Sequence, residues 1–248
     1  MAEKATEDGP VTLWERLERP ARTPRQRLSG ARIAAKAVAI ADEKGLCAVT
    51  MRTLAAELDA APMAAYRFVD GKDDLFALMV NEVYAELDVP SGPWREVLRE
   101  YAVQTRDMMH RHRWLAELPP HVTMTPTPNR LAAIDRALAS LDGLGLGTEA
   151  MMTATRTVAA FVHGTVGDEV ALADLQQVSR ASSREEVREA LGPQLQWMLA
   201  TGRFPVYERY LYESGCAEEP RAHFDAGLEL VLDGIAARIA RATGPVDS

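Results

Sequence analysis

Apolar residues recur along this chain at spacings of three and four, which is the period of an α-helix. No segment alternates apolar and polar residues as a surface strand would, and no Asn-Gly or Asp-Gly hairpin signal separates two apolar runs. Ser29 is suited to cap a first helix, which is predicted to end near Lys44-Gly45. The inward face of this helix is predicted to hold Ile33, Ala37, Ile40 and Ala41.

Two short helices are predicted next. Thr50 is suited to cap the first of them, and a tight connection, Asp59-Ala60-Ala61, leads to the second over 62–68. Pro62 opens the second helix, where its missing N–H costs little because that group has no helical partner in a first turn. The first of the two helices places its apolar residues at i, i+3, i+4 and i+7: Met51, Leu54, Ala55 and Leu58.

Two short helices joined by a three-residue turn, with a longer amphipathic helix before them, form a helix-turn-helix. Its second helix is small enough to enter a major groove about 12 Å wide, with its first residues at the base edges. Helix N-termini also bind phosphate through free N–H groups, and Thr50 stands where a backbone phosphate would lie. The alternative is that these are two ordinary short helices of a helical bundle.

The rest of the chain also has a helical period. A helix is predicted from Asp70-Gly71 to Leu87, with Leu75, Met79 and Val83 inward, and a break follows at 90–93. Further helices are predicted over 94–112, 128–141, 148–174, 184–201, 205–214 and 221–242. In the helix over 128–141, the apolar positions are Leu131, Ile134, Leu138 and Leu141.

These elements predict an all-α fold with an N-terminal three-helix helix-turn-helix domain and a larger C-terminal helical bundle domain. Residues 1–28 are polar, contain three prolines and are predicted to be a flexible basic arm, with Trp14 and Leu17 as residues that would dock it. The helix-turn-helix domain is assigned to 29–72, and a ligand-binding and dimerisation domain to 73–248.

Charge changes the picture once it is divided along the chain. The net charge of −8 is the opposite of what a nucleic-acid-binding protein needs against phosphates. Residues 16–72, however, hold eleven Lys/Arg and six Asp/Glu, a net charge of +5, so the remainder carries −13. A basic end on an acidic body fits a protein that docks one end on polyphosphate. A solvated basic tail is the alternative that charge alone leaves open.

Several classes of protein are not expected. The sequence has no apolar run of about 18 residues that would span a membrane, and Met1–Pro10 is no secretory signal. Cys47 and Cys216 lie outside any CxxC motif and are predicted to be reduced thiols of a cytoplasmic protein. The sequence contains no fingerprint of an enzyme. His110 and His112 fall on divergent helix faces, so no metal and no cofactor is expected.

Residues 29–87 resemble the TetR family, the tetracycline-repressor-like regulators. Gly45–Ala55 matches the family's Gly-hydrophobic-x-x-hydrophobic-Thr-Met-Arg-x-Leu-Ala run, and Tyr66, Lys72 and Leu75 match the residues that follow it. The stretches HRHRWLAELP and HFDAGLELVLDGI are similar to the family's helical ligand-binding domain. Together, these matches cover most of the chain.

Three positions depart from the family pattern. Asp59 stands where the family usually has Gly, and since Asp tolerates left-handed geometry, the turn is expected to survive. Ala65 replaces a leucine, which thins the local core. Phe68 stands where a histidine is common, which removes a possible phosphate donor.

The resemblance implies a set of DNA-facing residues beside Thr50. Arg67 would pair with guanine or grip a phosphate, whereas Thr50, Tyr66 and Lys72 would contact phosphates and set the register. Met63 and Ala64 offer apolar contact, for example to a thymine methyl group; Tyr66 as an aromatic at the edge of the core is the alternative. Arg25 and Arg27 are candidates for an arm along the minor groove or for a disordered tail. The implied DNA-facing residues are Arg52, Thr53, Pro62, Met63, Ala64, Tyr66, Arg67 and Lys72.

The C-terminal helices suggest a homodimer and a pocket. An apolar stripe at i, i+4, i+7 and i+11 faces either a second subunit, as in the family's four-helix dimer interface, or the subunit's own helix over 148–174. It consists of Phe224, Leu228, Val231 and Ile235. Methionines and aromatic residues suit a pocket for varied ligands, although each is more often core. The pocket candidates are Met108, His112, Trp114, Met152, Thr155, Arg156, His163 and Trp197; for His163, a role as a hydrogen-bonded core residue is slightly favoured.

The sequence therefore predicts a ligand-responsive transcriptional regulator, a repressor that binds a palindromic operator in double-stranded DNA as a dimer. A small, largely apolar or aromatic effector would release it. The alternative is a helix-turn-helix adaptor regulated by a protein partner, and stabilisation by a small ligand would discriminate the two.

Overall fold

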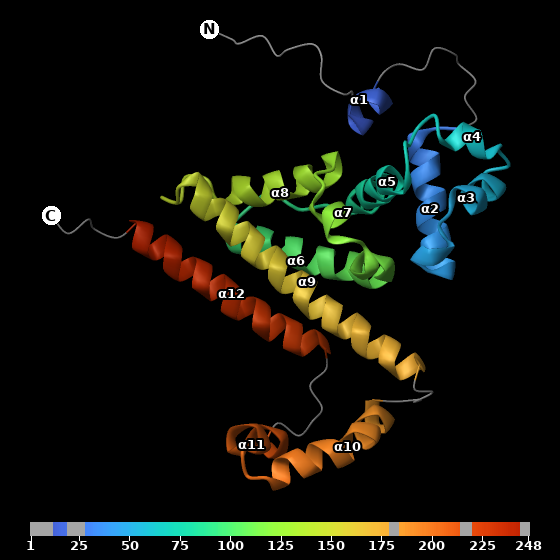
Figure 1. The fold of residues 1–248 in the computed structure, drawn as a ribbon. Helices are drawn as coiled ribbons and strands as arrows, with labels where there is room; N and C mark the ends of the chain where they lie inside the picture. The colour runs from blue at the N-terminus through green and yellow to red at the C-terminus, as the bar shows by residue number, and fades with distance from the viewer. Residues whose placement is uncertain (1–11, 19–27, 179–183, 214–219, 244–248) are drawn as a thin grey trace. The chain divides into compact units, whose positions relative to one another are not determined.

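The computed structural model describes residues 12–18, 28–178, 184–213 and 220–243, and within these ranges the regular elements are helices (Figure 1). The predicted all-α class is confirmed. The chain divides into two compact units, which we call the first unit (Met1–Asp88 and Arg111–Asp135) and the second unit (Val89–His110 and Arg136–Ser248). The assignment of separate DNA-binding and ligand-binding domains stays a prediction.

The first unit contains the predicted helix-turn-helix. Its helices are α1 (Leu13–Glu18), α2 (Gly30–Lys44), α3 (Met51–Glu57), α4 (Pro62–Ala65), α5 (Lys72–Tyr84) and α7 (Pro120–Met124), with short 3₁₀ turns η1 (Leu46–Ala48) and η2 (Arg113–Glu117). The predicted inward residues of α2 and of the helix ending near Leu87 are all buried. Periodicity therefore identified the core of this unit correctly.

Local capping explains where α2 and α3 begin. The Ser29 hydroxyl accepts the backbone N–H of Arg32 at 3.2 Å, and the Thr50 hydroxyl accepts that of Thr53 at 3.0 Å. Gly45, with φ of 80°, ends α2 and donates its N–H to the carbonyl of Ala41. These residues satisfy helix-end groups that would otherwise be left without a partner, as their positions in the sequence predicted.

Part of the predicted arm is a docked helix. Thr12 and Glu15 cap α1 reciprocally, since the Thr12 N–H donates to Glu15 Oε2 at 2.7 Å and the Glu15 N–H donates to Thr12 Oγ1 at 3.3 Å. Leu13 is buried, and Leu17 lies so close to Gly30 that a Cβ there would be 2.9 Å from its methyl group. The prediction that Leu17 docks the arm is thus confirmed, whereas Arg25 and Arg27 lie outside the described residues.

The second unit consists of long helices. They are α6 (Trp94–Arg111, of which Arg111 belongs to the first unit), α9 (Thr148–Val178), α10 (Arg184–Ala200), α11 (Pro205–Glu213) and α12 (Pro220–Thr243). In Figure 1, α9 and α12 lie side by side. Phe161 of α9 packs on Phe224 of α12 with ring centroids 5.4 Å apart, and Gly227 leaves room for the Phe161 ring.

Helix α8 (Pro128–Leu141) corrects one expectation. Leu131, one of the predicted apolar positions, is 52% exposed, whereas Leu141, another of them, is buried together with Ala133 and Ala137. Alanines form much of this face, so the leucines alone were a poor guide to its direction. Cys47 is exposed and unpaired, while Cys216 lies outside the described residues. None of the helices that the structure describes is long and apolar enough to cross a membrane.

Candidate nucleic-acid interface

The turn between α3 and α4 has the geometry that its sequence predicted. Asp59 adopts a left-handed conformation with φ of 51°. The N–H of Ala60 donates to the carbonyl of Ala55 at 3.0 Å, and the N–H of Asp59 donates to that of Ala56 at 3.3 Å. This pair of bonds is a Schellman motif, which redirects the chain at the end of α3. Asp59 therefore preserves the turn without glycine.

The left-handed Asp59 gives a simple prediction. Asp59→Gly is expected to raise the free energy of unfolding by up to about 1 kcal/mol, because glycine adopts positive φ without a steric penalty. Asp59→Val should lower it by about 1–2 kcal/mol, since a β-branched residue is a poor fit to that conformation. Urea denaturation of the two variants checks both signs, and equal stabilities would show that the turn carries no strain.

Helix α4 is short but is continued by a helical turn. The helix was predicted to run to residue 68, but the regular helix ends at Ala65. A turn continues it, because the N–H groups of Phe68 and Val69 both donate to the carbonyl of Ala65. Ala65 and Val69 are buried and anchor the turn, whereas Met63 is 73% exposed and Tyr66 is 45% exposed. Tyr66 thus lies at the surface with α4's other outward side chains.

Most residues implied to face DNA are at the surface of the first unit. Thr50, Arg52, Met63, Tyr66, Arg67 and Lys72 are exposed, Thr53 and Ala64 are half-buried, and Pro62 occupies the first turn of α4. Arg52, Arg67 and Lys72 make no ion pair with any residue in the described ranges. Lys72 Nζ also lies 5.1 Å from the centre of the Phe76 ring, a cation–π contact that does not neutralise its charge. The three cations are therefore not neutralised by described residues, and their contact with DNA stays a prediction.

Arg16 is a site residue that sequence reasoning missed. Its guanidinium pairs with Asp70, and its Nη2 donates to Asp74 Oδ2 at 2.9 Å. The hydrogen bond to Asp70 is the main reason why the pKa of Arg16 is raised, with burial opposing it. More than fifty residues separate these partners, so no local pattern in the sequence indicates the pairing.

His112 and Trp114, two of the predicted ligand contacts, are instead buried within the first unit. His112 Nδ1 lies 2.9 Å from Asp42 Oδ1, and its Nε2 lies 2.9 Å from Glu86 Oε1. The Trp114 indole N–H donates to Asp42 Oδ1 at 2.8 Å. Arg111 Nη2 donates to Glu86 at 2.6 Å. We call these five residues the His112 cluster; it joins α2 to the segments that follow α5 and precede η2.

The His112 cluster makes stability depend on pH. Burial acts to raise the pKa of Glu86, but hydrogen bonds from Arg111 and His112 outweigh it, so the pKa lies below its ordinary value of about 4.5. A carboxyl group whose pKa is lowered by folding stabilises the fold fully at pH values above its pKa in the unfolded state. That stabilisation is lost as the pH falls through its pKa in the folded state. We expect the melting temperature to fall between about pH 5 and pH 3 more steeply in the wild type than in Glu86→Gln; parallel profiles would contradict this.

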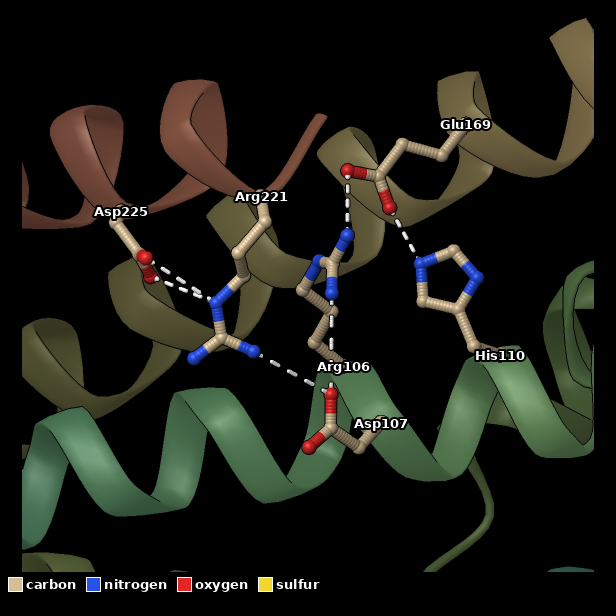
Figure 2. Close-up of polar contacts among 6 residues, drawn as sticks. All are labelled: Arg106, Asp107, His110, Glu169, Arg221 and Asp225. Carbon is tan, nitrogen blue, oxygen red and sulfur yellow. Dashed lines mark hydrogen bonds and ion pairs between the residues drawn. The ribbon is translucent and has the colours of Figure 1, made fainter. Parts of the chain in front are cut away.

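A second polar cluster lies in the second unit (Figure 2). Glu169 of α9 accepts from Arg106 Nη2 at 3.1 Å and lies 2.5 Å from His110 Nε2. Arg221 of α12 pairs with Asp225 at 3.1 Å and with Asp107 at 3.6 Å. The Arg106 guanidinium is nearly buried and stands 5.1 Å from the centre of the Phe224 ring. Ion pairs and this cation–π contact therefore join α6, α9 and α12.

The remaining predicted ligand residues do not converge. Met108 and Thr155 are buried in the second unit, and the Thr155 hydroxyl donates to the carbonyl of Met151. Met152, Arg156, His163 and Trp197 are exposed, with Trp197 at 71%. The slightly favoured prediction of His163 as a core residue is therefore wrong, since its flanking apolar residues point to the other side of α9. Helical periodicity identifies faces, but it does not say which faces meet.

The predicted dimer stripe lies largely inside its own unit. Phe224, Leu228 and Ile235 are buried and Val231 is half-buried, so the first two cannot form a partner surface. The other two stripe residues, Val231 and Ile235, line a groove of about 790 Å³ between α9 and α12. Its lining includes Ala150, Thr153, Ala154, Leu230, Val231 and Gly234. Leu230 is 75% exposed, which makes it the most exposed leucine of α12.

No group of three or more His, Cys, Asp or Glu that would hold a metal ion occurs among the described residues. The described residues of the interface offer a polar and cationic surface. A helix-turn-helix with exposed cations, attached to a helical body, defines the class of protein as a helix-turn-helix regulator.

Comparison with known proteins gives the family. Residues 88–239 match the family model described as the tetracyclin repressor-like C-terminal domain. The chain is 29% identical over 236 residues to the HTH-type transcriptional repressor DrrR1 of Streptomyces coeruleorubidus, which covers 94% of this chain and 86% of that protein. The chain therefore belongs to the tetracycline-repressor (TetR) family of transcriptional regulators.

Solved structures agree with this assignment. Apo ActR from Streptomyces coelicolor superposes with a TM-score of 0.70 at 26% identity, covering 88% of this chain and all of that one. ActR in complex with actinorhodin gives a TM-score of 0.68 at 25% identity, covering 85% of this chain and 96% of that one.

Proposed function

We propose that this chain is a ligand-responsive repressor that binds a palindromic operator as a homodimer and is released by a small, largely apolar or aromatic effector. The observation that carries the proposal is the helix-turn-helix itself. Capped α3, the Asp59 turn and the short α4 leave Arg52, Arg67 and Lys72 exposed and free of ion pairs with described residues. The similarity to a transcriptional repressor supports the sign of regulation.

The proposed contacts follow from side-chain chemistry. Arg67 would use its planar guanidinium for bidentate recognition of guanine, and the exposed Met63 would make an apolar contact. Thr50 caps α3 by accepting an N–H, which leaves its hydroxyl proton for a phosphate oxygen when Thr53 donates in the 2.8 Å contact between the two hydroxyls. Lys72, at the first residue of α5, adds charge at a helix N-terminus.

A dimer is proposed through the groove between α9 and α12. Exposed Leu230 and the small side chains of Ala150 and Ala154 allow close approach of a second copy across a twofold axis. Two copies would present their α4 helices about one turn of DNA apart, about 34–36 Å, so the operator would be a palindrome.

An effector is proposed to bind among the helices of the second unit. Thr105 Oγ1 and Arg106 Nε of α6 are buried without a hydrogen-bond partner among the described residues, which is unusual because such groups cost about 1–3 kcal/mol each. They would serve as polar anchors for a mainly apolar molecule. The similar protein ActR binds actinorhodin, which makes actinorhodin the first probe. Binding would shift the population to a conformer with lower operator affinity.

The proposal is tested with fragmented genomic DNA from the source organism. Purified protein at about 150 mM salt, where nonspecific binding is weak, is expected to enrich one palindromic sequence. Arg67→Ala should weaken binding to that sequence by about 5- to 150-fold, the equivalent of about 1–3 kcal/mol. Arg136→Ala, an exposed arginine of α8 in the second unit, is the matched control and should bind normally. Equal losses in the two variants would contradict the assigned interface.

The adaptor alternative is tested by ligand stabilisation. A ligand present at about 100 times its dissociation constant stabilises the fold by about 2.7 kcal/mol. Actinorhodin is expected to raise the unfolding midpoint of the wild type and less that of Thr105→Val. An unchanged midpoint in the wild type, together with operator binding that actinorhodin does not weaken, would count against this class of effector.

A further inference from the structure

Helix α1 contacts the start of α5 through one charged side chain. Arg16 pairs with both Asp70, in the loop before α5, and Asp74, in its first turn. Asp74 Oδ2 also accepts the backbone N–H of Asp70 at 2.9 Å, so the two carboxylates and the loop are held together. Buried Leu13 and the contact of Leu17 with Gly30 fix α1 in this position.

The residues that Arg16 pairs with lie beside a proposed phosphate contact. Lys72 is two residues from Asp70 and two from Asp74, so each Cα lies within about 7 Å of the Lys72 Cα along the chain. The Lys72 backbone is therefore within a Debye length, about 10 Å at 0.1 M salt, of the backbone of both acidic residues.

The recognition segment is also short of positive charge. Residues 50–74 contain three basic side chains, Arg52, Arg67 and Lys72, and five acidic ones. Lys36 and Lys44 of α2 supply positive charge nearby, but each lies 3.6 Å from Glu57 and is paired with it. The net charge around residues 50–74 therefore depends on cations from other segments.

We propose that α1 is an electrostatic mask for acidic side chains beside the DNA-binding surface: Arg16 offsets one of the two negative charges of Asp70 and Asp74 and thereby favours phosphate binding by Lys72. This inference rests on the proposed DNA-binding function. Asp74, in the first turn of α5, complements the N-terminal dipole of the helix, but its charge also repels DNA. Pairing with Arg16 lowers that repulsion.

The mask makes a prediction that a purely stabilising contact does not. Arg16→Gln is expected to weaken binding of a random-sequence 30-base-pair duplex by about three- to tenfold at about 100 mM salt, and the loss should shrink as salt rises, because screening shortens the reach of the exposed carboxylates. Asp70→Asn/Asp74→Asn should bind at least as tightly as the wild type. The triple variant, which joins these substitutions to Arg16→Gln, should regain wild-type affinity.

Two controls separate charge from folding. Arg16→Lys keeps the positive charge and should bind within about twofold of the wild type. Circular dichroism of every variant should show an unchanged helical content, since Arg16 is partly exposed. A triple variant as weak as Arg16→Gln would overturn the mask, because Arg16 would then act on DNA directly. Wild-type affinity in Arg16→Gln would also overturn it. A wild-type chain that binds neither this duplex nor the enriched palindrome would overturn the proposed function as well.

Discussion

Leu230→Arg is expected to convert the proposed homodimer into a monomer at micromolar concentration and to weaken operator binding by about 100-fold or more. Leu230 is 75% exposed at the groove between α9 and α12, so the substitution leaves the core of the subunit intact. In a twofold dimer formed through this groove, each new guanidinium group would be buried at the interface without a partner, which costs several kcal/mol. The loss of affinity follows because a monomer engages one half-site and loses the high effective concentration of the second recognition helix.

Leu131→Arg is the matched control for this variant. Leu131 is also an exposed leucine, at 52%, but it lies on α8 in the first unit and does not line the groove. Sedimentation velocity and operator titration of the two variants test the interface. A dimeric Leu230→Arg protein with normal operator affinity would show that this groove is not the dimer surface.

His112→Ala is expected to lower the free energy of unfolding by about 2–4 kcal/mol, measured by urea denaturation. The ring is nearly buried and lies between Asp42 and Glu86 at 2.9 Å from each, so its loss leaves two carboxylates facing a cavity. A value near the lower end is expected because both carboxylates are about one-third exposed and water can reach them.

His110→Ala is the control for the His112 variant. His110 also pairs with a carboxylate, Glu169, but its side chain is 36% exposed, so its loss should cost about 1 kcal/mol or less. Equal losses of unfolding free energy in the two variants would contradict the expectation that the His112 cluster stabilises the fold more than the His110–Glu169 pair does. Because the His112 cluster joins α2 to the segment before η2, His112→Ala is expected to alter operator affinity as well.

The sequence was sufficient for most of the helices, although not for α1 or α7, and for the turn between α3 and α4. Ser29, Thr50 and Gly45 act through bonds to residues three or four positions away, so their effect can be predicted locally. Asp59 was likewise predictable, because left-handed geometry is a property of one residue and its turn.

Contacts between distant segments were not predictable in the same way. His112 and Trp114 were expected in a ligand pocket, yet they bond to Asp42, which is about seventy residues away. An apolar stripe such as Phe224 and Leu228 has the same period whether it faces its own subunit or a second one. Arg16 belonged to a segment expected to be flexible, so its pairing with Asp70 and Asp74 had no local signal. In each case helical periodicity gave the face of the helix but not its neighbour.

The proposed function requires sequence-specific DNA binding by α3 and α4. The most direct test is the ratio of two dissociation constants at about 150 mM salt, one for the enriched palindrome and one for a scrambled duplex of the same length and base composition. A specific regulator is expected to bind the palindrome at least about 1,000-fold more tightly. A ratio near one, in a folded protein freed of bound effector, would contradict the account.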